Sequence, residues 1–230
     1  ATDPNKWVGG WIYEIISRFT WQLPQTIGGF FTSHAYNTFG LAGGVESVDY
    51  LYGATVVKTR DDGGWGITQG SYIIGGNQIE ANANNPLFQH EYGHYIQSQK
   101  FGLAYYSRVG IPSIRSAMID DPNYDHDFND VEQDANRRAF IYFNKNVEGF
   151  QNDNTLTEHL YSDNTGWDFD RNPLNINGSN NRLQYIDYRD IEQRSWLNNL
   201  KIGTTWYDFA SWGYLLYGGP IWAGLYNAGM

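Results

Sequence analysis

The chain is 230 residues long, carries a formal net charge of −10 at pH 7 and contains no cysteine. Without cysteine, disulfides, thiol catalysis and cysteine-ligated zinc are excluded. The negative charge argues against a nucleic acid partner, because phosphate binding needs clustered lysine and arginine. A hydrophobic content of 41% is ample for a packed core. We therefore expect one domain over residues 1–230, with an N-terminal part (1–65), a central core (66–145) and an aromatic-rich C-terminal lobe (150–230).

The N-terminal part predicts a helix followed by strands. Residues 7–19 place apolar side chains at helical spacing, namely Trp7, Ile12, Ile15, Ile16 and Phe19. Pro24 and the glycines at 28 and 29 are expected to end that region. Residues 45–58 are rich in valine, tyrosine and threonine and predict one or two strands. Residues 61–64, Asp-Asp-Gly-Gly, strongly predict a turn, and residues 65–79 predict strands interrupted at 75–76.

A helix of about four turns is predicted to begin after Asn85. Asn85 suits the N-cap and Pro86 suits the first helical position, while Lys100 and Gly102 suit the last turn and the C-terminal end. Gly93 lies inside this helix, where glycine costs about 1 kcal/mol relative to alanine. We expect this glycine to permit either close packing or access of a substrate.

This helix carries the pattern H-E-x-x-H from His90 to His94. At about 100° per residue, positions i and i+4 differ by about 40° around the helix axis, so both imidazoles leave the same face and can share one metal ion. Glu91 lies about 100° round from His90 and can reach a water on that metal without being a ligand. The pattern therefore predicts a catalytic zinc site with Glu91 as the general base.

Catalytic zinc usually takes three protein ligands, and the third is expected from a second helix. Residues 120–130 are rich in aspartate and asparagine and predict a loop, after which Asp130 is a plausible N-cap with Gln133 completing a capping box. One face of this second helix is small and apolar except for two polar positions, and it comprises Glu132, Ala135, Asn136, Ala139, Phe140 and Phe143. A buried carboxylate needs a cationic partner, so Glu132 is the preferred third ligand, and His126 and Asp134 remain alternatives.

Further roles around the zinc follow from position. Asn136, one turn after Glu132, can hydrogen-bond a ligand imidazole and set its orientation. Asp134 is expected to point away from the face that carries Glu132. Candidates for stabilising the transition state, beyond the metal itself, are Tyr106, Tyr142 and His126.

The last third of the chain carries no motif. Residues 150–182 predict a long loop, residues 186–200 and 204–216 predict helices, and residues 209–230 contain no charged side chain. The last stretch is long enough to cross a bilayer, but its Gly-Gly-Pro sequence would break a spanning helix. We expect a buried C-terminal helix and turn, and membrane contact is the less favoured alternative.

These motifs resemble those of the gluzincin group of zinc metallopeptidases, in which H-E-x-x-H is followed by a helix bearing Glu-x-x-x-Asp/Asn. The match runs through His90, Glu91, His94, Glu132 and Asn136. The metzincin pattern is absent, because residues 95–100 contain no histidine. The resemblance implies an α+β, zincin-like fold with a small mixed sheet and an active-site helix packed on the second ligand-bearing helix. It also implies a zinc (Zn2+) endopeptidase that cleaves peptide or protein substrates.

Three runs of residues, 76–82, 85–99 and 132–137, are similar to C-terminal domains of bacterial YD-repeat (RHS-type) surface or toxin proteins, and the similarity covers about residues 66–145. This similarity implies a secreted or cell-surface location and the effector end of a larger protein, with a cognate inhibitor or immunity protein as a partner. It also leaves open the alternative of a zincin-fold toxin or binding module without peptidase activity.

Overall fold

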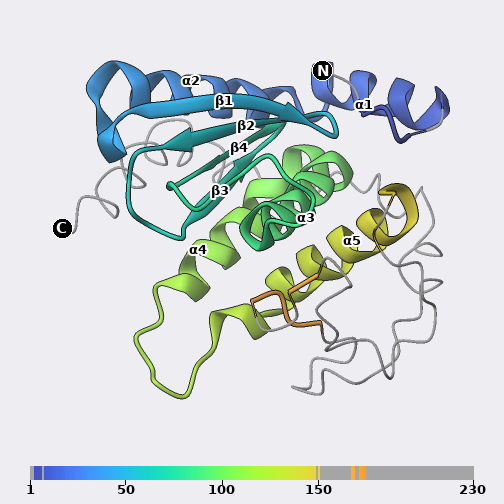
Figure 1. Cartoon of the computed structure of the whole chain (residues 1–230). Coiled ribbons are helices and arrows are strands. Elements are labelled where there is room, and N and C mark those ends of the chain that lie inside the picture. Colours follow the sequence, from blue (N-terminus) through green and yellow to red (C-terminus); the bar gives the residue numbers. More distant parts are fainter. Residues whose placement is uncertain (1–2, 7, 149, 151–166, 169–170, 175–230) are drawn as a thin grey trace.

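The computed structural model describes residues 3–6, 8–148, 150, 167–168 and 171–174 (Figure 1). Over these residues the chain has an α+β fold with a small mixed sheet, as expected. The helices are α1 (Val8–Phe19), α2 (Leu23–Phe39), α3 (Pro86–Phe101), α4 (Ile111–Ala117) and α5 (Asp130–Asn146). The strands are β1 (Val45–Leu51), β2 (Ala54–Thr59), β3 (Gly66–Gln69) and β4 (Tyr72–Gly75).

The four strands lie in the order β1-β2-β4-β3. β1 and β2 form an antiparallel hairpin whose turn places Tyr52 at φ 47° and Gly53 at φ 84°. β2 and β4 are parallel, and β3 pairs antiparallel with β4. Residues 61–64 therefore do not close a hairpin as a tight turn would, because β2 and β3 are not neighbours. They belong instead to the crossover that parallel pairing requires.

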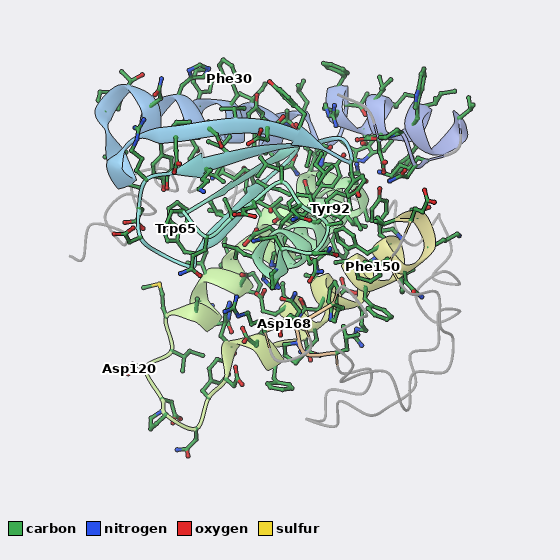
Figure 2. The ribbon with its side chains drawn as sticks, in the orientation of Figure 1. Phe30, Trp65, Tyr92, Asp120, Phe150 and Asp168 are labelled. Carbon is green, nitrogen blue, oxygen red and sulfur yellow. The ribbon has the colours of Figure 1, made fainter. Side chains whose placement is uncertain are left out.

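The sheet lies between α2 on one face and α3 on the other (Figure 1). Alternation along the paired strands explains this layering. Val57 and Ile74 pack with Tyr36 of α2, whereas Val56 and Ile73 belong to the larger core beneath α3 and α5. Tyr92 of α3 is fully buried in that larger core (Figure 2).

α3 begins and ends where the sequence predicts. The Asn85 side chain accepts a hydrogen bond from the Phe88 amide at 2.9 Å, Pro86 occupies the first turn, and Gly102 ends the helix at φ 52°. Gly93 permits close packing, since a Cβ atom there would lie 2.1 Å from the carbonyl oxygen of Ala135 on α5. The backbones of the two helices that carry the predicted ligands therefore lie close together at Gly93, which has no side chain to separate them.

α5 differs at its start from the prediction. The N-cap is Asn129, whose side chain accepts from the Val131 amide at 3.0 Å, and Asp130 is already the first helical residue. Gln133 completes no capping box, because its amide donates to the carbonyl oxygens of Asp127 and Pro173. Asparagine and aspartate are equally good N-cap residues, so the sequence alone allows the helix to begin after either Asn129 or Asp130.

α1 is a helix as expected, but its apolar face is turned outward. Ile12, Ile16 and Phe19 are 43%, 46% and 67% exposed, whereas Glu14 is completely buried. Glu14 is held inside by Arg18 at 3.0 Å and by the Tyr95 hydroxyl, which donates to it at 2.5 Å. Because leaving this ionised group buried without those partners would be costly, the buried pairing sets the orientation of the helix.

α2 was not predicted, because Pro24 and the glycines at 28–29 were expected to end the helical region. Pro24 lies in the first turn, where proline is compatible with a helix. Gly29 packs where a Cβ atom would lie 2.6 Å from the carbonyl oxygen of Gln69 on β3. Phe30 lies on the opposite, outer side of this helix and is 44% exposed (Figure 2).

The predictions for residues 186–200, 204–216 and 209–230, and most of the loop predicted over 150–182, lie outside the described residues. Within the part of the chain that is described, no helix combines the length and apolar character needed to cross a bilayer.

Candidate metal centre

α3 and α5 bring together three side chains of the types that bind metals. His90 and His94 leave the same face of α3, and the opposing Glu132 projects from the first turn of α5. The carboxylate oxygen Oε2 of Glu132 lies 3.2 Å from Nε2 of His90 and 2.9 Å from Nε2 of His94. One potential ligand atom from each residue lies within 4.8 Å of the others, so this group could hold a metal ion.

Outer hydrogen bonds set the tautomer of each imidazole. Nδ1 of His90 lies 2.9 Å from Oδ1 of Asn136, and Nδ1 of His94 lies 2.8 Å from Oε1 of Gln97. Both amides are oriented by their nitrogens, since Asn136 donates to Pro173 and Gln97 donates to the Val131 carbonyl and to Asp134. Amide oxygens accept only, so each Nδ1 carries the proton and each Nε2 presents a lone pair toward Glu132.

Two lone pairs facing one carboxylate oxygen require a cation between them. Without a metal, protons bound to the imidazoles supply this positive charge. Burial lowers the pKa of His90, but its hydrogen bond to Glu132 and the charge of that carboxylate outweigh burial and raise the pKa to about 9. The pKa of His94 is likewise raised, with burial again opposed by the Glu132 charge. Burial alone would raise the pKa of Glu132, but the two imidazoles hold it well below its usual range.

The donor set could hold a metal ion. The Glu132 side chain is completely buried, and its second oxygen, Oε1, has no hydrogen-bond partner among the described residues. An anionic group in such surroundings is stable only when it is paired. Two imidazole nitrogens and one carboxylate oxygen form a ligand set typical of catalytic zinc.

Glu91 occupies a separate position beside the three donors. It is 4% exposed, and its Oε2 accepts from the Thr68 hydroxyl of β3 at 2.7 Å. A Cβ atom at Gly66 would lie 2.5 Å from Oε1 of Glu91, so glycine at that position leaves space beside the second oxygen. The carboxylate is thus anchored through one oxygen, and β3 makes room for the other.

The centre opens into a cleft of about 1000 Å3. His90, Glu91, His94 and Glu132 all line it. The remaining wall combines residues 64–69 on and before β3 with largely apolar groups around α4, among them Tyr105, Tyr106, Val109, Ile111, Ile114 and Met118. A mostly apolar cleft with a few converging polar groups is typical of a binding site for small or extended ligands.

The other predicted site residues are distributed differently. Nε2 of His126 lies 3.8 Å from Oε1 of Glu132, outside the three-donor group. Asp134 does not belong to the three-donor group, and its carboxylate binds Arg138 at 2.7 Å and Gln97 at 2.8 Å. Tyr106 lines the cleft, but burial raises its pKa and its hydroxyl lies against Gly28 of α2. Tyr142 donates to Asp3 within the core and does not line the cleft.

Sequence reasoning missed Gln97 and Thr68. Gln97 could have been found, because it lies three residues after His94 and therefore one turn away on the same helix face. Thr68 carried no signal, since its contact with Glu91 joins a strand to a helix 23 residues later.

Comparison with known proteins adds no relative. No protein-family model, curated protein or solved structure matches this chain at a significant level. The site must therefore be interpreted from its own geometry.

Proposed function

We propose that this protein is a zinc-dependent metallopeptidase of zincin-like fold that hydrolyses internal peptide bonds. The observation that carries the proposal is the convergence of His90, His94 and Glu132 within 4.8 Å, beside a separately anchored Glu91, at the wall of a cleft. A structural zinc site would need neither a buried carboxylate outside the ligand set nor an open cleft.

Each side chain has a distinct task in such a reaction. Zinc bound to the three donors would supply a water of lowered pKa and polarise the scissile carbonyl. Glu91 takes the proton of the attacking water and delivers it to the nitrogen of the leaving amine as the C–N bond breaks. Thr68 holds one Glu91 oxygen, which leaves the other directed to the side where Gly66 makes room.

β3 is the edge strand beside the centre and offers a track for an extended substrate. The Trp65 carbonyl accepts a hydrogen bond from the Gly76 amide, next to β4, whereas the Thr68 carbonyl accepts one from the Tyr105 hydroxyl at 3.0 Å. By strand alternation, Gly66 and Thr68 therefore present their backbone groups away from β4. The Thr68 carbonyl is already bonded to Tyr105. Gly66, next to Glu91, is therefore the position where the backbone of a substrate would form hydrogen bonds with β3.

The decisive experiment compares Glu91→Gln with His94→Ala in the full chain. Elemental analysis of purified, untagged protein should find about one zinc in the wild type and in Glu91→Gln, and a large loss in His94→Ala. Hydrolysis of a broad library of quenched fluorescent peptides should disappear in both variants. His34→Ala is the matched control, because His34 is exposed and contacts Phe30 on α2. Full activity of Glu91→Gln would remove Glu91 from the mechanism.

A zincin-fold binding or toxin module without hydrolysis remains the competing proposal. It predicts bound zinc without peptide cleavage in the wild type, so the same two measurements separate it from the peptidase. The bacterial secreted context and a cognate inhibitor protein rest on the sequence resemblance and belong to the proposal in either form.

A further inference from the structure

His126 stands at the end of a chain of hydrogen bonds that begins at the N-cap of α5. Asn129 Nδ2 donates to the Tyr124 hydroxyl at 3.0 Å, and that hydroxyl lies 2.6 Å from the Ser116 hydroxyl. The Ser116 hydroxyl lies 2.8 Å from Nδ1 of His126. The imidazole is 33% exposed and lines the cleft with its other nitrogen, Nε2, on the side of the metal centre.

The helix cap fixes the first bond of this chain. Oδ1 of Asn129 accepts from the Val131 amide at 3.0 Å, so Nδ2 must face Tyr124, and it can only donate. The Tyr124 oxygen is thereby an acceptor, and its own proton goes to Ser116, whose proton goes to Nδ1 of His126. In the reverse direction Tyr124 would accept two hydrogen bonds, and Nε2 of His126 would turn a lone pair toward the carboxylate of Glu132, 3.8 Å away. The first direction avoids that repulsion and leaves the proton of the neutral imidazole on Nε2.

Nε2 of His126 lies on the side of the Glu132 oxygen that has no hydrogen-bond partner among the described residues. Oε1 of Glu132 is buried without a hydrogen bond among the described residues, and Nε2 of His126 is 3.8 Å away. The other two donors already have outer partners, Asn136 for His90 and Gln97 for His94. At 3.8 Å the two atoms are in ion-pair contact and are not hydrogen-bonded, so the gap must close by less than about 1 Å for Nε2 to donate to Oε1. Metal-binding carboxylates are usually hydrogen-bonded through their second oxygen.

We propose that His126 is the positioning residue of Glu132, with its tautomer fixed by the relay Asn129–Tyr124–Ser116. The inference rests on the proposed metal centre and assigns each of its three ligands one outer partner. Its physical effect is to reserve Oε1 for His126 and Oε2 for the metal. His126 then acts through Glu132 and does not act on the substrate.

The test measures zinc affinity of the full chain by competition with a chromophoric chelator, with no substrate present. His126→Ala should weaken zinc binding by about tenfold to a hundredfold, the range found when outer partners of metal ligands are removed. Ser116→Ala and Tyr124→Phe should weaken zinc binding by a smaller factor. Each variant removes a hydrogen bond that fixes the tautomer of His126 but keeps the imidazole itself. His34→Ala should bind zinc as the wild type does.

A conservative rescue separates hydrogen bonding from packing. His126→Gln still offers an N–H donor but has no Nδ1 for Ser116, so its affinity should return to within a few-fold of the wild type. In the His126→Gln background, Ser116→Ala should then have no further effect. In the cobalt-substituted protein, His126→Ala should also change the visible absorption bands, because Glu132 is free to turn both oxygens to the metal.

Three results would overturn this assignment. One is zinc affinity that is unchanged in His126→Ala while His94→Ala abolishes binding, which would leave the metal centre intact and remove His126 from it. Another is unchanged affinity with slower peptide hydrolysis, which would place His126 on the substrate. The third is a wild-type protein that binds no zinc, which would end the metal centre and this inference together. Loss of hydrolysis alone, with the affinity pattern as expected, would overturn the peptidase proposal only.

Discussion

Replacing Gly93 with alanine tests whether the close approach of α3 and α5 builds the metal centre. A Cβ atom at this position would lie 2.1 Å from the carbonyl oxygen and 2.5 Å from the carbonyl carbon of Ala135. Ordinary contact begins near 3.4 Å, and the opposing atoms belong to backbone that cannot rotate away. The helices must therefore separate by about 1 Å at the point between their ligands.

The expected magnitude combines two opposing effects. Overpacking of a close-packed interface destabilises by about 1–3 kcal/mol, whereas alanine in place of glycine gains about 1 kcal/mol of helix propensity. Because the contact is with backbone, we take the upper end of the first range and expect a net loss of about 2 kcal/mol. Ligand distances must hold within about 0.2 Å, so we also expect zinc affinity to fall by at least about tenfold.

Urea unfolding of the metal-free protein and chelator competition measure the two effects separately. Gly10→Ala is the matched control, since Gly10 also lies inside a helix but the nearest atom to its added Cβ would be the Cβ atom of Lys6, at 3.2 Å, which requires a shift of only a few tenths of an ångström. That variant should be as stable as the wild type or slightly more stable. If Gly93→Ala matches Gly10→Ala in stability and keeps full zinc affinity, the packing argument is wrong.

Further predictions concern the groups around the donors. Thr68→Val should lower kcat with zinc content unchanged, because it frees Glu91 without touching a ligand; an unaltered kcat would contradict this role. Gln97→Leu should weaken zinc binding by about tenfold or more, measured by chelator competition. In metal-free protein the raised pKa of His90 adds stability that is complete below its ordinary value of about 6.5 while Glu132 stays ionised, and that disappears as pH rises through about 9, which urea midpoints between pH 6 and 10 would detect. Zinc binding at pH 7.5 should release at least one proton, seen by calorimetry in buffers of different ionisation enthalpy.

The local features of the centre were accessible to sequence reasoning because helices are periodic. The spacing of His90 and His94 places both imidazoles on one face whatever the surrounding fold. The caps at Asn85 and Gly102 bound that helix through short-range hydrogen bonds and backbone preferences. The choice of Glu132 followed from its place on a face that is apolar except for Glu132 and Asn136, and the structure indeed buries Glu132 completely.

Features that depend on distant contacts were missed or assigned wrongly. The apolar side of α1 faces outward because Glu14 pairs inside with Tyr95, 81 residues later. The turn expected at residues 61–64 gives way to a crossover because β4, which follows in sequence, takes the place beside β2. α2 was not predicted, because its proline and glycines are typical of the end of a helix and the contact of Gly29 with β3 is not visible in the local sequence.

Sequence alone thus determined which side chains could bind a metal and on which helices they lie, because the repeat of a helix converts spacing directly into direction. Tertiary structure decided how those side chains are held. Thr68 reaches Glu91 from a strand, and the N-cap of α5 reaches His126 through Tyr124 and Ser116. Such contacts depend on how separate elements pack together, and no local repeat in the chain encodes that arrangement.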